Sequence, residues 1–151
     1  MNVIIPVDGS ERSESALDWY KTHAHMEANT VWLIHCAKMP SLDAGGGEVF
    51  LTADMYSNAL LKLKAEVKKY EEKCTELLKS KGINGRVKTF FNSRVGEVIV
   101  EAAKELNAGL IIVSSRGHGS VRRAVLGSVC DYLIHEAPCN VAVHMVKSRA
   151  Q

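Results

Sequence analysis

Short apolar runs alternate with amphipathic stretches along the chain, and this alternation constrains the fold more than any other feature. Four clear runs lie at residues 3–7, 31–36, 110–113 and 141–146, with a weaker one at 87–91. Continuous apolar runs are typical of strands buried on both faces of a parallel sheet. Parallel strands need right-handed crossovers, which place helices over the sheet. The sequence therefore predicts a doubly wound, Rossmann-like α/β fold with helices on both faces, in a single domain over residues 1–151.

Four stretches between or after these runs have helical periodicity. The first is expected to begin near Ser10 and to end before Asn29, and the second, long and amphipathic, to end near Gly82. In the last one Ser128 is expected to cap the first turn, because its hydroxyl can accept a backbone N–H. Pro40 and three consecutive glycines predict a long loop over residues 38–51. The periodic apolar residues span 17–24, 60–77 and 95–106, and the last helix is expected to run from Ser128 to about Glu136.

Composition excludes several classes of function. A net charge of +2, without a clustered basic face, does not support nucleic-acid binding. No apolar run approaches the length of a membrane span, and no basic leader or signal-peptide pattern opens the sequence. Cys36, Cys74, Cys130 and Cys139 have neither CxxC spacing nor paired histidines, which predicts reduced thiols rather than a metal or redox site. We therefore expect a cytoplasmic protein with no nucleic-acid or membrane partner.

The candidate ligand site is expected beyond the carboxyl ends of the strands, where the strand order of a doubly wound sheet reverses. The loops after the first and fourth strands, residues 8–10 and 114–128, should face one crevice there. At the last helix, unpaired backbone N–H groups and the helix dipole favour an anion, while Gly127 permits close approach and Ser128 can donate its hydroxyl. Alternatively, Gly127 only permits a tight turn and Ser128 only caps its own helix.

Asp8, at the end of the first strand, has two equally weighted interpretations. Its carboxylate could hold a ribose hydroxyl or a magnesium ion, or it could cap the first helix together with Glu11. The signatures of P-loop ATPases, dinucleotide-binding folds and GxSxG hydrolases are absent from the sequence. We therefore expect no catalytic residues and no efficient hydrolase.

Several motifs, in one order along the whole chain, resemble those of the universal stress protein family. They are Val7-Asp8-Gly9-Ser10, the segment from Gly96 to Ala103, Ser115-Arg116-Gly117-His118-Gly119, and the segment from Leu126 to Tyr132 followed by Ala137-Pro138-Cys139. Each motif alone is weak, but the set is specific. The resemblance implies a five-stranded parallel sheet in the order 3-2-1-4-5.

In the ATP-binding branch of that family the phosphate loop has the form GxxGx9G(S/T). Gly117, Gly127 and Ser128 match it here, but Ser114 replaces the first glycine. If the backbone there required a positive φ, serine would cost about 1 to 2 kcal/mol, and about 1.4 kcal/mol is a tenfold loss of affinity. Because serine is small and can hydrogen-bond, we expect ATP, ADP or AMP binding to be weakened rather than lost.

The resemblance also implies the residues of the nucleotide site and the oligomeric state. Family members commonly dimerise through the last strand, so residues 141–146, an apolar sheet edge, are expected to pair with a second copy. The implied function is an ATP-binding, homodimeric stress-response protein; the alternatives are a slow ATPase or phosphotransferase with Asp8 holding Mg²⁺, and a dimerising module that binds no nucleotide. The implied nucleotide-site residues are Pro6, Val7, Asp8, Cys36, Ala37, Ser114, Arg116, Gly117, Gly119, Gly127, Ser128 and Val129.

Overall fold

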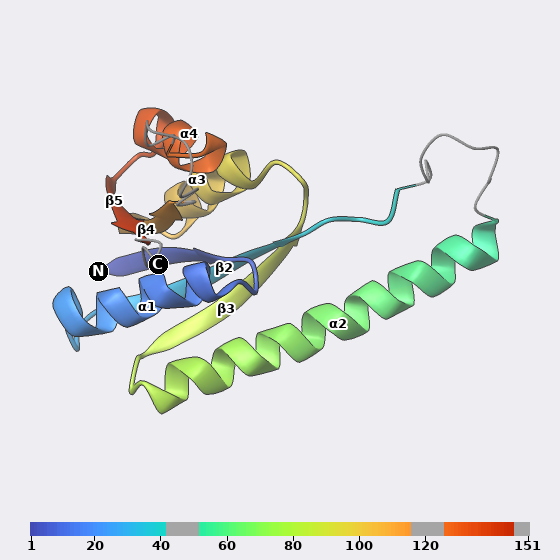
Figure 1. Ribbon diagram of the computed structural model, residues 1–151, viewed down its shortest axis with the longest axis horizontal. Coiled ribbons are helices and arrows are strands. Elements are labelled where there is room, and N and C mark those ends of the chain that lie inside the picture. Colours follow the sequence, from blue (N-terminus) through green and yellow to red (C-terminus); the bar gives the residue numbers. More distant parts are fainter. Residues whose placement is uncertain (42–51, 116–125, 147–151) are drawn as a thin grey trace, which may run out of the picture.

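A five-stranded parallel sheet in the order β3-β2-β1-β4-β5 forms the centre of the molecule (Figure 1). The computed structural model describes residues 1–41, 52–115 and 126–146. The predicted fold class and the strand order implied by the family resemblance are both confirmed. In chain order the elements are β1 (Asn2–Val7), α1 (Glu11–His23), β2 (Thr30–Ala37), α2 (Ala53–Ser80), β3 (Gly85–Phe91), α3 (Val95–Glu105), β4 (Ala108–Ser115), α4 (Ser128–Glu136) and β5 (Asn140–Met145).

Helices cover both faces of the sheet, as the buried strands require. Side chains alternate between the faces of β1, so Val3 and Ile5 pack with α1 and α2, whereas Ile4 packs with α3 and α4. Figure 1 shows α1 and α2 on one side of the sheet and α3 and α4 on the other. In α2 the buried side chains, Val67, Cys74 and Leu78, all lie in the C-terminal half, and the N-terminal half extends past the sheet.

The end of the first helix agrees with the prediction, whereas the end of the fourth strand does not. The first helix ends at His23, before Asn29, and the buried Asn29 amide then lies within 3.2 Å of the Tyr20 hydroxyl. The fourth strand extends through Ser114 and Ser115, which pair with His144 and Met145 of β5. Ser114 is therefore a strand residue rather than a loop residue, because a fifth strand is available to pair with it.

A split in the sheet positions the candidate site. The ladder between β1 and β4 ends at Ile4 and Ile111, although both strands continue for three or more residues. Pro6 lies in the separated part of β1 and has no N–H to donate to a neighbouring strand. The split lies at the carboxyl ends of the strands, where the chain order of the sheet reverses, which is the expected ligand position in such folds.

No helix in the described ranges combines the length and the hydropathy that crossing a bilayer requires.

Candidate functional site

A cavity of about 170 Å³ lies where β1 and β4 separate. Its walls come from the carboxyl ends of three adjacent strands and from the first turns of α1, α3 and α4. Six residues predicted for the nucleotide site line it: Pro6, Val7, Asp8, Cys36, Ser114 and Val129. The structure thus brings together, from distant parts of the chain, half of the predicted residues.

The other predicted residues have different positions. Ala37 is buried in β2 but does not line this cavity, and Ser128 lines a separate, open hollow between α3 and α4 that shares Val95 and Val129 with the cavity. Gly127 directly precedes α4. Arg116, Gly117 and Gly119 lie outside the described residues.

Ser10 also lines the cavity, as expected for the loop of residues 8–10. Five further lining residues were missed from the sequence: Arg12, Ser13, Ile34, Val95 and Val113. Strand alternation could have found two of them, because Ile34 shares a face with Cys36, and Val113 lies on the same side of the sheet. Arg12 and Ser13 could have been found from the first turn of the helix that follows Asp8. Val95 carries no comparable sequence signal, because it reaches the cavity only through the packing of α3.

The turn between β1 and α1 is held by local hydrogen bonds. Ser10 is the N-cap of α1, and its hydroxyl accepts the Ser13 N–H at 3.3 Å. The Asp8 carboxylate accepts the Ser10 N–H at 2.9 Å, so the Asp8–Glu11 capping alternative is not what forms. Gly9 has φ +83°, which a side chain would strain. Asp8 is thereby fixed at the cavity by a turn that only glycine makes easily.

Tyr70 of α2 ties this turn to the long helix. Its hydroxyl accepts the Gly9 N–H at 2.8 Å, and its ring meets His35 edge-on, with the centroids 4.7 Å apart. Burial, with a further contribution from Cys74, raises the pKa of Tyr70, so the hydroxyl remains protonated. Burial lowers the pKa of His35, although the carboxylates of Glu71 and Asp8 act in the opposite direction. Neutral side chains therefore support the turn from the α2 side.

Cys36 lines the cavity as an unreactive thiol. Burial raises its pKa, which leaves little thiolate at neutral pH. All four cysteines of the chain are free; Cys74 and Cys130 are buried, whereas Cys36 and Cys139 are half-buried. Packing and backbone contacts are therefore the contribution that Cys36 can make here.

Ser114 connects two helices at the edge of the cavity. Its hydroxyl donates to the Arg12 carbonyl of α1 at 2.7 Å, and its own carbonyl accepts the Cys130 thiol of α4 at 3.4 Å. Among the described non-glycine residues a positive φ occurs at Asn107 and not at Ser114. The condition under which serine would cost backbone strain is therefore not met.

The start of α4 has donors available for an anion. Gly127 is its N-cap, with φ +86° and ψ 155°, and no side chain caps the first turn. The prediction that Ser128 caps this helix is wrong, because Ser128 lies one position inside it. A Cβ at Gly127 would meet no atom of the described residues beyond its chain neighbours within 4 Å. Uncapped amides and open space are features that a bound phosphate group would use.

Comparison with known families decides the classification. Residues 1–145 match the universal stress protein family. The chain belongs to the universal stress protein family. Among curated relatives, a universal stress protein of Thermus aquaticus is 27% identical over 139 residues, covering 92% of this chain and 94% of the relative. The universal stress protein YxiE of Bacillus subtilis is 24% identical, with 93% and 96% covered.

Solved structures share the fold of this universal stress protein. A hypothetical protein named MJ0577 aligns with a TM-score of 0.75 and 24% identity, covering 97% of this chain and 96% of that one. The universal stress protein UspA of Lactobacillus plantarum aligns with a TM-score of 0.68 and 19% identity, covering 95% and 96%. These likenesses support the architecture of the sheet and helices.

Proposed function

We propose that this universal stress protein binds an adenine nucleotide in the cavity between β1 and β4 and acts as a stress-response protein whose surface depends on that ligand. The observation that carries the proposal is the convergence of Asp8, Cys36 and Ser114 on one cavity beside the uncapped start of α4. Three structural neighbours, 14% to 20% identical, support it: one from Arabidopsis thaliana has AMP bound, one is in complex with cAMP, and one from Archaeoglobus fulgidus is in complex with dAMP.

The cavity walls suit the two ends of a nucleotide differently. Ile34, Cys36 and Val95 offer an apolar surface for a base, whereas the Asp8 carboxylate can accept ribose hydroxyls. The phosphates belong at the first turn of α4, with Ser128 and Val129. Within the described residues no three His, Cys, Asp or Glu side chains converge on a metal position. We therefore assign Mg²⁺ to the phosphates of the nucleotide, and Asp8 to its ribose.

Thermal unfolding with and without ATP and Mg²⁺ tests this proposal. A ligand that binds only the folded state at about 100 times its Kd adds about 2.7 kcal/mol to the free energy of unfolding. For a chain of this size that raises the melting temperature by about 5 to 10 °C. We expect this shift with ATP, ADP or AMP, and no shift with equal concentrations of NaCl. An unchanged melting temperature at millimolar nucleotide would contradict the proposal.

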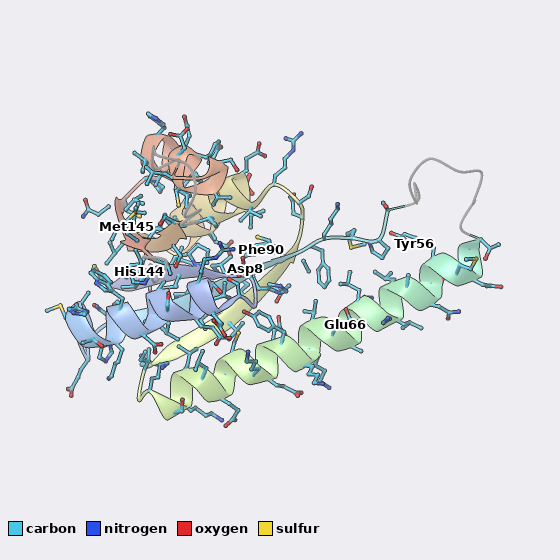
Figure 2. The ribbon with its side chains drawn as sticks, viewed as in Figure 1. Asp8, Tyr56, Glu66, Phe90, His144 and Met145 are labelled. Atoms are coloured by element: carbon cyan, nitrogen blue, oxygen red, sulfur yellow. The ribbon has the colours of Figure 1, made fainter. Side chains whose placement is uncertain are left out.

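We further propose a homodimer that forms through β5. This strand is an edge of the sheet, with β4 as its neighbour among the described residues. Figure 2 shows Met145 on the α4 side of β5 and His144 beside α1. Met145 and Ile134 of α4 are 49% and 47% exposed, so apolar side chains flank the open edge. A second copy paired along β5 would form hydrogen bonds with the backbone groups of this edge and cover these side chains.

Sedimentation velocity tests the dimer. The 16.6 kDa chain is expected to sediment at twice that mass. Met145→Lys should shift it to the monomer, because a two-fold axis would bring two added charges into one interface. The matched control is Met26→Lys, since Met26 is 64% exposed and follows α1 rather than β5. A dimer that survives Met145→Lys, or a wild-type monomer, would argue against β5 as the interface.

The proposed setting is the cytoplasm, where the four free cysteines would stay reduced. We assign the nucleotide the role of a bound ligand rather than a substrate, since ligand occupancy can shift the population of surface conformations offered to a partner.

A further inference from the structure

Arg12 is a charged residue of the cavity to which neither the sequence motifs nor the proposed nucleotide contacts give a role. It is the second residue of α1, is half-buried and lines the cavity. Asp8 and Arg12 are the charged residues in the described lining. Across residues 1–41, 52–115 and 126–146, six ion pairs form and Arg12 takes part in none of them. A cation at a cavity wall without a carboxylate partner is suited to an anionic ligand.

The backbone at Arg12 is fixed next to the first turn of α4. Ser114 makes the connection, because its hydroxyl donates to the Arg12 carbonyl at 2.7 Å while its carbonyl accepts the Cys130 thiol at 3.4 Å. The first turns of α1 and α4 therefore meet at one residue of β4. Arg12 in the first turn of α1 and Val129 in the uncapped first turn of α4 both line the cavity.

A second set of hydrogen bonds holds Arg12 from the other side. The Ser15 hydroxyl also donates to the Arg12 carbonyl, at 2.7 Å, and the Ser15 oxygen lies 3.1 Å from Nε2 of His144 in β5. Because the Ser15 proton is directed to Arg12, its oxygen is the acceptor of the His144 N–H. Two hydroxyls thus converge on one carbonyl, and the start of α1 is tied to both β4 and β5.

The two charges of the cavity differ in what they can recognise. The Asp8 carboxylate repels phosphate and accepts hydroxyl donors, so it suits the ribose. A guanidinium donates paired N–H groups in a planar arrangement that matches phosphate oxygens. The geometry points to Arg12 as the residue through which this cavity distinguishes adenine nucleotides from adenosine, by contacting their phosphate. This assignment rests on the proposed nucleotide site and specifies its selectivity.

Isothermal titration with adenosine, AMP, ADP and ATP tests the assignment on the full chain. Arg12→Gln is expected to weaken binding of each nucleotide about tenfold, the scale of one charge-assisted hydrogen bond, and to leave adenosine affinity within about twofold. The matched control is Arg86→Gln, which makes the same change in net charge at the opposite end of the sheet, where Arg86 is exposed over the Trp32 ring. It should leave all four affinities unchanged.

The outcomes separate the assignment from the proposed function. If wild-type protein binds ATP and Arg12→Gln binds it equally well, the assignment to Arg12 fails while the nucleotide site stands. An equal loss for adenosine and ATP would also overturn it, since Arg12 would then act on the shape of the cavity rather than on phosphate. The same loss of nucleotide affinity in Arg86→Gln would show that the effect comes from net charge at long range, and this would also overturn the assignment. Wild-type protein that binds no nucleotide at all would remove the proposed function and the assignment together.

Discussion

Replacing Gly127 with alanine is expected to weaken nucleotide binding by about tenfold or more and to lower the free energy of unfolding by about 1 to 3 kcal/mol. Its φ of +86° and ψ of 155° lie in a region that is essentially restricted to glycine, which sets the stability cost. Relief of that strain would rotate the backbone at the start of α4 and misdirect the amides that should hold the phosphate. One charge-assisted hydrogen bond lost there corresponds to about tenfold in affinity.

Gly82→Ala is the matched control for this prediction. Gly82 follows α2 with φ +61°, and a Cβ there would also meet no protein atom within 4 Å. The variant should lose about 1 kcal/mol of stability but keep its nucleotide affinity. Urea denaturation and titration calorimetry on both variants measure the two effects separately. Equal affinities in Gly127→Ala and wild type would show that the start of α4 does not hold the ligand.

Leu17→Ala is expected to lower the free energy of unfolding by about 2 to 5 kcal/mol. Leu17 is fully buried in α1 and belongs to the core between α1, α2 and the sheet. The loss combines the transfer free energy of the removed carbons with the cost of the cavity left behind. Because the free energy of unfolding of native proteins is only about 5 to 15 kcal/mol, this one substitution would remove a large share of it.

The comparison for Leu17→Ala is Leu61→Ala in α2. The chemistry of the substitution is identical, but Leu61 is 65% exposed. We expect its free energy of unfolding to stay within about 0.5 kcal/mol of wild type. Chemical denaturation of both variants in one buffer checks the pair. A cost for Leu61→Ala close to that of Leu17→Ala would mean that the exposed half of α2 is packed against a partner in solution.

The parallel sheet could be predicted because most strands carry a continuous apolar run, whereas the strand order followed from the resemblance to the family. The start of α2 was harder, since the helix begins at Ala53, seven residues before Leu60, the first residue whose periodicity was evident. No side chain of residues 53–59 is among the buried ones of α2, and their apolar residues do not continue the periodicity that begins at Leu60. Thr52 instead caps the helix, because its hydroxyl accepts the Met55 N–H at 3.2 Å.

At the site, the residues found from motifs are those whose type alone suggests chemistry, such as Asp8 and Gly127. Arg12 was missed because it belongs to no motif, although it lies in the first turn of the helix after Asp8; a hydrogen bond from Ser114, 102 positions away, fixes its backbone. The position of Ser114 likewise could not be predicted from its neighbours, because it depends on pairing with β5. Because serine replaces the glycine of the family motif, the sequence suggests a loss of affinity, whereas in the folded chain the Ser114 hydroxyl binds α1 while its carbonyl accepts a hydrogen bond from α4.

The length of α2 determines which part of this molecule unfolds locally first. Its 28 residues span about 42 Å, yet its buried side chains begin only at Val67. Amides of the anchored C-terminal half can exchange with solvent only when the core itself opens, whereas those nearer Ala53 need only local fraying. The C-terminal half of α2, where Tyr70 supports the cavity turn, should therefore open rarely. Its N-terminal end should fray, and a protease would cleave the helix there first.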